Sequence, residues 1–224
     1  MRNLRIPVLL PLMFVLTMSG CASIPLPNMD GILGGQMPLT ESTVADGLKE
    51  ALRVGTDRTS SSLSAQGGFS DNTLLRIALP SNFETAASRL RSLGLGKQVD
   101  EFEIQMNRAA EQAAAEAVDV FVAAIQGMTL QDAFAILNGP EDAATVYFRD
   151  RTTVELPPRF RPVVQTAMEK VGIYNAYNTL VNRYNSIPLV KPVTVDLEAH
   201  IVEKTLFGMF SVLASEEQLI RENP

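Results

Sequence analysis

The chain holds few of the residue types from which metal or redox sites are built. It has one cysteine, Cys21, and one histidine, His200, in 224 residues. Zinc sites of the usual kind need several Cys or His ligands together. His200 and Glu203 lie three apart on a predicted helix, but di-iron bundles need two Glu-x-x-His pairs. We therefore expect no metal ion and no cofactor, and we place His200 at the edge of the apolar face of its helix, as a surface or boundary residue.

Hydrolytic chemistry is also weakly supported by the residue pattern. The Gly-x-Ser-x-Gly motif of serine hydrolases is absent from the sequence. Two carboxylates are enough for glycoside hydrolysis, and such a pair carries no sequence signature. Tryptophan, a usual platform for sugars, is absent. We expect a protein that is not an enzyme, with a carboxylate-based hydrolase as the least favoured alternative.

Three polar residues occupy an unexpected position on the clearest predicted helix, which runs from Lys97 to Met128. Glu103, Asn107 and Glu111 are spaced four apart and fall on its apolar side. A buried carboxylate costs several kcal/mol unless it is paired. These residues either line a polar cleft or form a structural network in which Arg149, or else Arg151 or Arg161, neutralises Glu111. We favour the structural network.

The N-terminal segment indicates export and lipidation. Arg2 and Arg5 precede an apolar run and then small residues, which is the order of a bacterial secretory signal. The stretch "MSGC" resembles a lipoprotein signal, so we expect residues 1–20 to be removed and Cys21 to carry a stable lipid anchor. An ordinary signal peptide with an incidental cysteine is the alternative. Ala22 resembles the residue that follows the cysteine in lipoproteins sorted to the outer membrane.

Charge and composition limit the partners of the exported chain. The net charge is −6, and the signal segment contains basic residues but no acidic ones. Binding to nucleic acid needs clusters of Lys or Arg, which this acidic chain lacks. Membrane contact is therefore expected through Cys21 alone. Residues 21–40 combine the lipidated cysteine with a tether rich in Pro and Gly.

Residues 41–224 show helical periodicity throughout, which predicts a single all-α domain. We expect a compact bundle of about eight to ten helices. The segment Leu74–Leu79 fits either a short helix or a small β element. Thr129 and Asp132 have the spacing of a capping box. Glu217 and Arg221 have the spacing of a helical ion pair on a last helix that is apolar over more than half its circumference.

Several segments together resemble one bacterial family. They are "MNRAAEQAAAEA", "LQDAFAILNG", "DAATVYFRDRT", "FRPVV" and "LFGMFSVLASEEQLIRENP". In this order they are similar to the family known as domain of unknown function 4197, over about residues 40–224. The resemblance implies an exported, often lipid-anchored and helical protein. It implies no catalytic residues.

Two functions fit these features best. The first is a non-enzymatic binding module, anchored in the outer membrane and facing the periplasm, that interacts with an envelope protein. The second is a carrier or sensor of an apolar ligand such as a lipid. A deep apolar pocket with Glu103, Asn107 or Glu111 at its mouth would favour the carrier. A solid core with an exposed apolar patch, or one rich in Tyr and Asn such as "YNAYNTLVNRYN", would favour the binding module.

Overall fold

The computed structural model describes residues 40–152, 154 and 156–222 of the chain. All of them belong to one compact unit, Leu39–Pro224. Cys21, the predicted signal segment 1–20 and most of the predicted tether 21–40 lie outside the described residues, so lipidation stays a prediction from the sequence.

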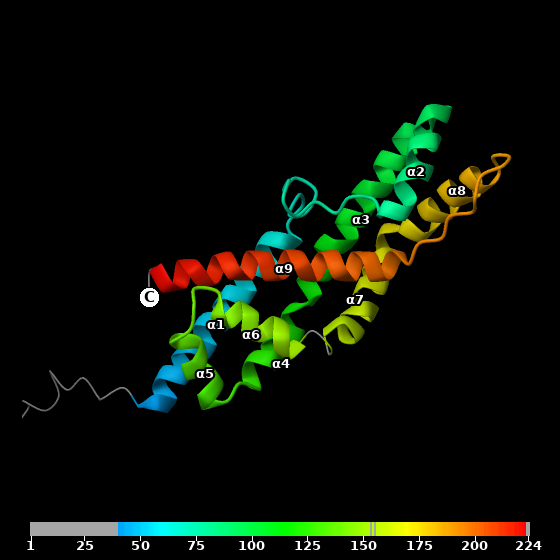
Figure 1. Cartoon of the computed structure of the whole chain (residues 1–224). Coiled ribbons are helices and arrows are strands. Elements are labelled where there is room, and N and C mark those ends of the chain that lie inside the picture. The colour runs from blue at the N-terminus through cyan, green and yellow to red at the C-terminus, as the bar shows by residue number, and fades with distance from the viewer. Residues whose placement is uncertain (1–39, 153, 155, 223–224) are drawn as a thin grey trace, which may run out of the picture. The chain divides into compact units, whose positions relative to one another are not determined.

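The described residues form an all-α fold, which confirms the predicted fold class (Figure 1). The helices follow one another along the chain with short connections, apart from the longer segments after α1 and α8. In order they are α1 (Glu41–Ser64), α2 (Ser81–Leu90), the π-helical stretch η2 (Arg91–Leu95), α3 (Gly96–Glu116), α4 (Val118–Gln126), α5 (Leu130–Leu137), α6 (Ala143–Thr152), α7 (Leu156–Val171), α8 (Ile173–Asn185) and α9 (Leu197–Glu222).

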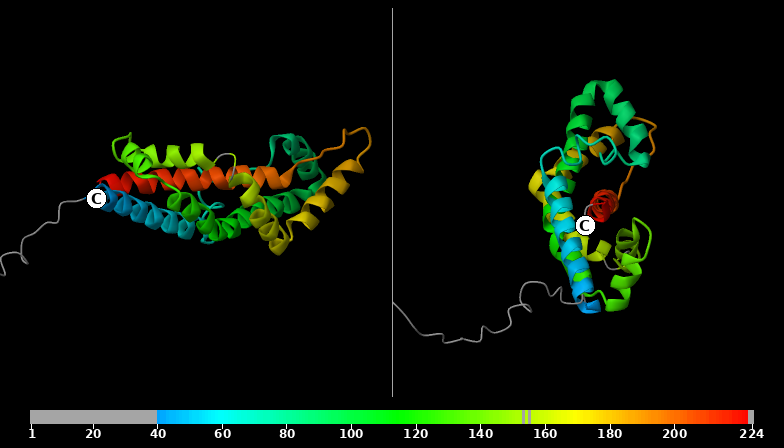
Figure 2. Two further views of the ribbon diagram at one scale, coloured as in Figure 1. Left: turned by 90° about the horizontal axis from the view of Figure 1, so that it is seen from below. Right: turned by 90° about the vertical axis from the view of Figure 1, so that its left-hand side faces the viewer.

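Two helices, α3 and α9, organise the packing of the others. Helix α3 packs against α1, α7, α8 and α9, and α9 also packs against α1, α6 and α7. Figure 2 shows α9 end-on between α1 and α6. The apolar face predicted for α3 and α4 is buried, as Phe102, Met106 and Phe121 show. Alanines 109, 110, 113 and 114 are fully buried, and their small side chains let neighbouring helices approach α3 closely.

The helix predicted as continuous from Lys97 to Met128 is interrupted at Ala117, where α3 ends and α4 begins. No Pro or Gly lies at this break. The hydroxyl of Ser60 on α1 donates to the carbonyl oxygen of Ala114 at 2.8 Å, and the Ala117 N–H also donates to it at 3.4 Å. In a continuous helix that carbonyl would accept from Val118. A side chain that enters the hydrogen-bond ladder is a known cause of helix kinks.

A sharp corner joins α4 to α5, and the predicted capping box forms there. The Asp132 N–H donates to the Thr129 hydroxyl oxygen at 3.1 Å, and the Thr129 N–H donates to the Asp132 carboxylate at 3.0 Å. Donation from the Thr129 hydroxyl, and then from its backbone N–H, lowers the pKa of Asp132 to about 2.

Among the described residues, no single helix is long and apolar enough to cross a bilayer. Helices α4 and α5 meet that test only as a pair, and the pair is bent by 104°.

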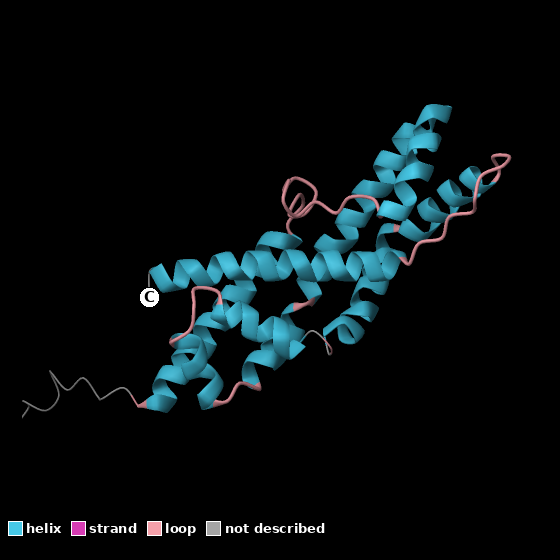
Figure 3. Ribbon diagram, in the orientation of Figure 1, coloured by secondary structure: helices cyan, strands magenta, loops and turns pink. Residues whose placement is uncertain are grey.

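Residues 65–80 form a loop that enters the core, and Figure 3 shows no strand in it. The β element considered for Leu74–Leu79 is therefore wrong: the segment is a loop. Phe69 in this loop is fully buried against Gly208 of α9. A Cβ atom at position 208 would lie 2.6 Å from a ring carbon of Phe69. The glycine thus makes room for the aromatic ring that fastens the loop to α9.

We predict that Gly208→Ala destabilises the protein, because the added methyl group overlaps a buried ring that cannot move freely. Overpacking of this kind costs about 1–3 kcal/mol. Gly47→Ala is the matched control, since position 47 is an exposed helical site on α1 with nothing within 4 Å of the new atom. It should stabilise by about 0.5–1 kcal/mol. Urea unfolding followed by circular dichroism measures both. Equal stability of Gly208→Ala and the parent would contradict the packing described here.

Candidate functional site

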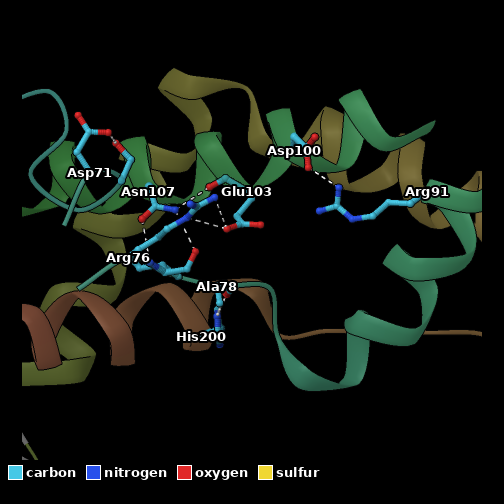
Figure 4. Close-up of polar contacts among 10 residues, drawn as sticks. Asp71, Arg76, Ala78, Arg91, Asp100, Glu103, Asn107 and His200 are labelled. Carbon is cyan, nitrogen blue, oxygen red and sulfur yellow. Dashed lines mark hydrogen bonds and ion pairs between the residues drawn. The ribbon is translucent and has the colours of Figure 1, made fainter. Parts of the chain in front are cut away.

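Glu103, Asn107 and Glu111, the polar row of α3, lie one turn apart on the same side of the helix. All three make hydrogen bonds to the loop 65–80, and Figure 4 shows those of Glu103 and Asn107. The sequence placed them on the apolar side of the helix. In the structure, that side faces the loop 65–80 at these three positions. Each polar side chain meets backbone or side-chain groups of the loop.

Glu111 is only 5% exposed, and one of its carboxylate oxygens lies at the centre of a group of donors. It accepts from the N–H groups of Gly67 at 3.2 Å and of Phe69 and Ser70 at 3.3 Å each, and from the Ser70 hydroxyl at 3.3 Å. Gly67 has a positive φ of 89°, which helps to turn successive N–H groups toward one point. Such a concave arrangement of backbone N–H groups binds anions.

The arginine expected to neutralise Glu111 is not there, and backbone donors take its place. Arg149 does not join the polar row, because its guanidinium carbon lies 5.8 Å from the ring centre of Phe210. The other two arginines considered have carboxylate partners of their own: Arg151 pairs with Asp132 at 3.2 Å and Arg161 with Glu198 at 3.3 Å. The structural interpretation of Glu111 is therefore supported, with different partners from those proposed.

Asn107 binds both backbone groups of Ile77, near the end of the loop, as a neighbouring β-strand would. Its Oδ1 accepts from the N–H of Ile77 at 2.9 Å, and its Nδ2 donates to the carbonyl oxygen of Ile77 at 3.0 Å. The same nitrogen donates to the Glu103 carbonyl oxygen at 2.8 Å. The buried amide therefore satisfies both backbone groups of Ile77, which explains a strand-like sequence in a segment without a strand.

The residues on either side of Ile77, Arg76 and Ala78, are held by side chains from two helices, as Figure 4 shows. Arg76 donates to Glu103 of α3 through Nε at 2.9 Å, with Nη2 at 2.8 Å. From α9, Nε2 of His200 donates to the carbonyl oxygen of Ala78 at 3.0 Å. Because Arg76 is half-exposed, this ion pair is worth at most about 1 kcal/mol. His200 thus has a structural partner at the edge of α9.

A hollow of about 320 Å³ also touches Asn107 and Glu111. Most of its lining residues are of polar types, with Asp71, Arg76 and Arg108 among them. The amide of Asn107 and one carboxylate oxygen each of Glu103 and Glu111 are already engaged with the loop. The hollow therefore does not match the deep apolar pocket that would favour a carrier with these residues at its mouth.

A second buried carboxylate, Glu217 of α9, binds backbone donors in the same way. Its two oxygens accept from the N–H of Ala144 at 2.8 Å and from the N–H and hydroxyl of Thr145 at 2.9 Å each. Arg221 donates to it at 3.0 Å, which is the ion pair expected from the sequence. Sequence reasoning missed the contact with α6. The available signal was the position of Glu217 on the buried face of α9, four residues after Leu213.

The tyrosines of α8 are occupied inside the fold. Tyr174 donates to Glu198 at 2.8 Å, and burial together with this bond raises its pKa to about 12. The hydroxyl of Tyr177 accepts from the N–H of Val195 at 3.0 Å. Tyr184 is buried. These contacts indicate that the tyrosines of this segment pack inside the fold and do not form the Tyr-rich recognition patch considered from the sequence.

Two grooves flank the exposed side of α9. The loop groove, of about 860 Å³, lies between α9 and residues 74–84. The arginine groove, of about 490 Å³, is lined by α9 together with α6 and α7, which contribute Arg149, Leu156, Pro157 and Arg161. Ala199, Glu203 and Phe207 of α9 line both grooves. The apolar face of α9, wider than one packing partner covers, was the only sequence signal for these surfaces.

Large apolar side chains are exposed along the loop groove. Leu74 is 85% exposed and Phe207 is 59% exposed, and both line it. No group of three or more His, Cys, Asp or Glu side chains suited to a metal ion occurs in the part of the chain that the structure describes. The grooves along α9 are therefore the candidate functional surface.

We predict that Glu111→Gln weakens the attachment of the loop far more than Glu103→Gln, the same change on the same helix. Glu111→Gln removes the charge that holds three backbone N–H groups, that of buried Phe69 and those of partly buried Gly67 and Ser70, at a cost of about 1–3 kcal/mol. Glu103→Gln breaks a half-exposed ion pair worth less than about 1 kcal/mol. Urea unfolding measures the two costs.

Hydrogen exchange locates the effect of Glu111→Gln. Amides of Gly67, Phe69 and Ser70 should exchange faster, with protection of α1 unchanged. The same loss of stability in both variants, or unchanged exchange in residues 67–70, would contradict the role assigned to Glu111.

A comparison with protein families agrees with the resemblance noted in the sequence. A family model described as "Protein of unknown function (DUF4197)" matches residues 38–224, which include all the helices described above. No curated protein and no solved structure matches the chain significantly. The family match covers most of the sequence, and the chain therefore belongs to the DUF4197 family.

Proposed function

We propose that this protein is a lipid-anchored binding module of the outer membrane, facing the periplasm, that docks a partner protein in the loop groove. The observation that carries this proposal is the pair of exposed apolar side chains that line the groove, Leu74 and Phe207. Exposed apolar residues grouped around a concave surface are typical of protein interaction sites. Aromatic residues such as Phe207 are enriched in such sites.

The other residues of the loop groove fit a protein partner better than a small apolar ligand. Basic side chains, Arg76 and Lys204, line it together with the acidic side chains of Glu84, Asp196 and Glu203. A protein surface can match charges of both signs around an apolar centre, and such complementarity gives specificity and fast association. A lipid tail has no charge with which to complement those side chains.

The loop wall of the groove is held in place before any partner arrives. The polar row of α3 and His200 of α9 fix this segment through the bonds described above. A wall fixed in advance loses little conformational entropy on binding, which raises affinity. This supports a preformed recognition surface.

The distribution of carboxylates supports a non-enzymatic role. The two buried acids, Glu111 and Glu217, accept hydrogen bonds from backbone N–H groups. Glycoside hydrolysis instead needs two acids that face each other across the substrate. The carboxylate-based hydrolase therefore stays the least favoured function. The arginine groove, with its apolar lining, favours a second function, the binding of an apolar ligand.

The anchor is expected to depend on Cys21 alone. Cells that express the full chain with Cys21→Ser should neither label it with radioactive palmitate nor process it to the mature size, because the acceptor thiol is missing. Ser23→Ala, two residues along, is the control and should be labelled normally. Palmitate in the Cys21→Ser protein would refute lipidation at this site.

The docking surface can be tested by site-specific photo-crosslinking in intact cells. A photoreactive residue at Phe207 or at Leu74 should give an adduct with the same envelope protein, since both side chains line one groove. Leu93 of η2 is the matched control, because it is 60% exposed and lines neither groove. Lys204→Glu should remove both adducts by reversing a charge in the groove.

Two results would contradict the docking surface. One is an equal yield of the same adduct from Leu93. The other is a set of unrelated partners at Phe207 and Leu74, since a single docked protein must reach both positions.

A further inference from the structure

The arginine groove differs from the loop groove in the chemistry of its walls. From α9 it is lined by Val202, Leu206, Phe207 and Phe210, and from α7 by Leu156 and Pro157. A groove with apolar walls and a few polar groups at defined places is the common form of a small-ligand site. Its volume of about 490 Å³ lies within the range of about 300–1,000 Å³ found for such sites.

The polar groups of this groove are mainly cationic. Arg149 of α6 lies over the ring of Phe210, and Arg161 of α7 also lines the groove. The hydroxyl of Ser211 donates to the Phe207 carbonyl oxygen at 2.8 Å. The one acidic residue of the lining, Glu203, pairs with Lys204 at 3.0 Å. Two guanidinium groups beside an apolar wall, in a chain of net charge −6, favour an anionic head on an apolar ligand.

Arg161 already contacts acidic side chains, and these contacts leave it able to exchange partners. It lies 3.3 Å from Glu198 and 3.9 Å from Asp196, and its own side chain is partly exposed. Exposed ion pairs contribute little to stability. A guanidinium has five N–H donors, so it can accept a carboxylate in addition to Glu198.

The dimensions favour a single acyl chain over larger partners. The lining follows α9 from Ala199 to Ser211, which corresponds to about 18 Å of helix. An extended long-chain acyl group matches that length. A phospholipid carries two such chains, and a docked helix is about 10 Å across, so each is bulkier than a groove of about 490 Å³ can hold.

We propose that the arginine groove binds a free fatty acid, with the acyl chain along α9 and the carboxylate at Arg149 and Arg161. This site is separate from the docking of a protein partner in the loop groove, although the two grooves meet at Phe207. It assigns the chain a second binding activity, for a single-chain amphiphile with a carboxylate head.

Fluorescence quenching tests this proposal directly, because the chain contains no tryptophan. Phe207→Trp places one reporter, the groove reporter, beside the groove. Leu93→Trp places an equally exposed one, the control reporter, on η2. The protein used starts at Ala22 and so keeps the whole compact unit Leu39–Pro224. Circular dichroism and thermal unfolding first check that every variant is folded. The probes are dibromostearic acid, whose bromines quench at short range, and its uncharged methyl ester.

The acid should quench the groove reporter saturably and leave the control reporter unquenched. It should bind at least tenfold more tightly than the ester. Changing both arginines, Arg149→Gln with Arg161→Gln, should remove that preference. Ser211→Phe, combined with Phe207→Trp, should abolish quenching by filling the groove, and its thermal unfolding shows whether the fold is kept.

Other outcomes would overturn the proposal. Equal affinities for acid and ester, or equal quenching of the control reporter, would exclude a carboxylate site in this groove. Quenching only by vesicles of brominated phosphatidylglycerol would assign the surface to a membrane. A shift in the emission of the groove reporter by an acidic amphipathic peptide, without quenching by the acid, would assign it to a protein. None of these results decides the docking surface, because Leu74 lines the loop groove and not the arginine groove, and its crosslinks test that surface independently.

Discussion

The structure depends on one electrostatic constraint: a carboxylate inside the fold must be given donors. Glu111 meets it by binding the backbone N–H groups of residues 67–70, more than forty positions earlier in the chain. That contact fixes the start of the loop, which brings Phe69 into the core beside Gly208. With the loop so placed, Ile77 reaches Asn107 and Ala78 reaches His200. These contacts together position the loop residues that form one wall of the loop groove.

Glu217, near the C-terminal end of α9, is also a buried carboxylate that binds backbone N–H groups. It binds the first turn of α6, where a helix has N–H groups without partners and a favourable dipole for a negative charge. Helix α6 in turn supplies Arg149 to the arginine groove. Both grooves therefore have one wall held by a buried carboxylate and share α9 as the other wall. The stability of the fold and the shape of its binding surfaces come from the same contacts.

The sequence predicted the features that depend on local pattern. The helical class, the buried face with Phe102 and Phe121, the capping box at Thr129 and the family all follow from periodicity, spacing or similarity. The sequence placed Glu103, Asn107 and Glu111 on the side of the helix that meets the loop, but it did not predict their partners. Backbone N–H groups carry no residue signature, so an arginine was expected where a loop backbone binds. The break at Ala117 depends on Ser60 of another helix, and the grooves depend on how four segments meet.

The bond between Asn107 and Ile77 has a consequence for how this protein behaves among many others. The segment around Ile77 is rich in apolar residues, and such segments tend to recruit strands from neighbouring chains when their backbone groups are unpaired. Asn107 takes up both backbone groups of Ile77, and the buried side chain of Ile77 adds to the protection. The side-chain amide of Asn107 thus leaves Ile77 with no free backbone group to pair with a β-strand of another chain. The folded protein can present an apolar surface to its partners while keeping the backbone of Ile77 out of reach.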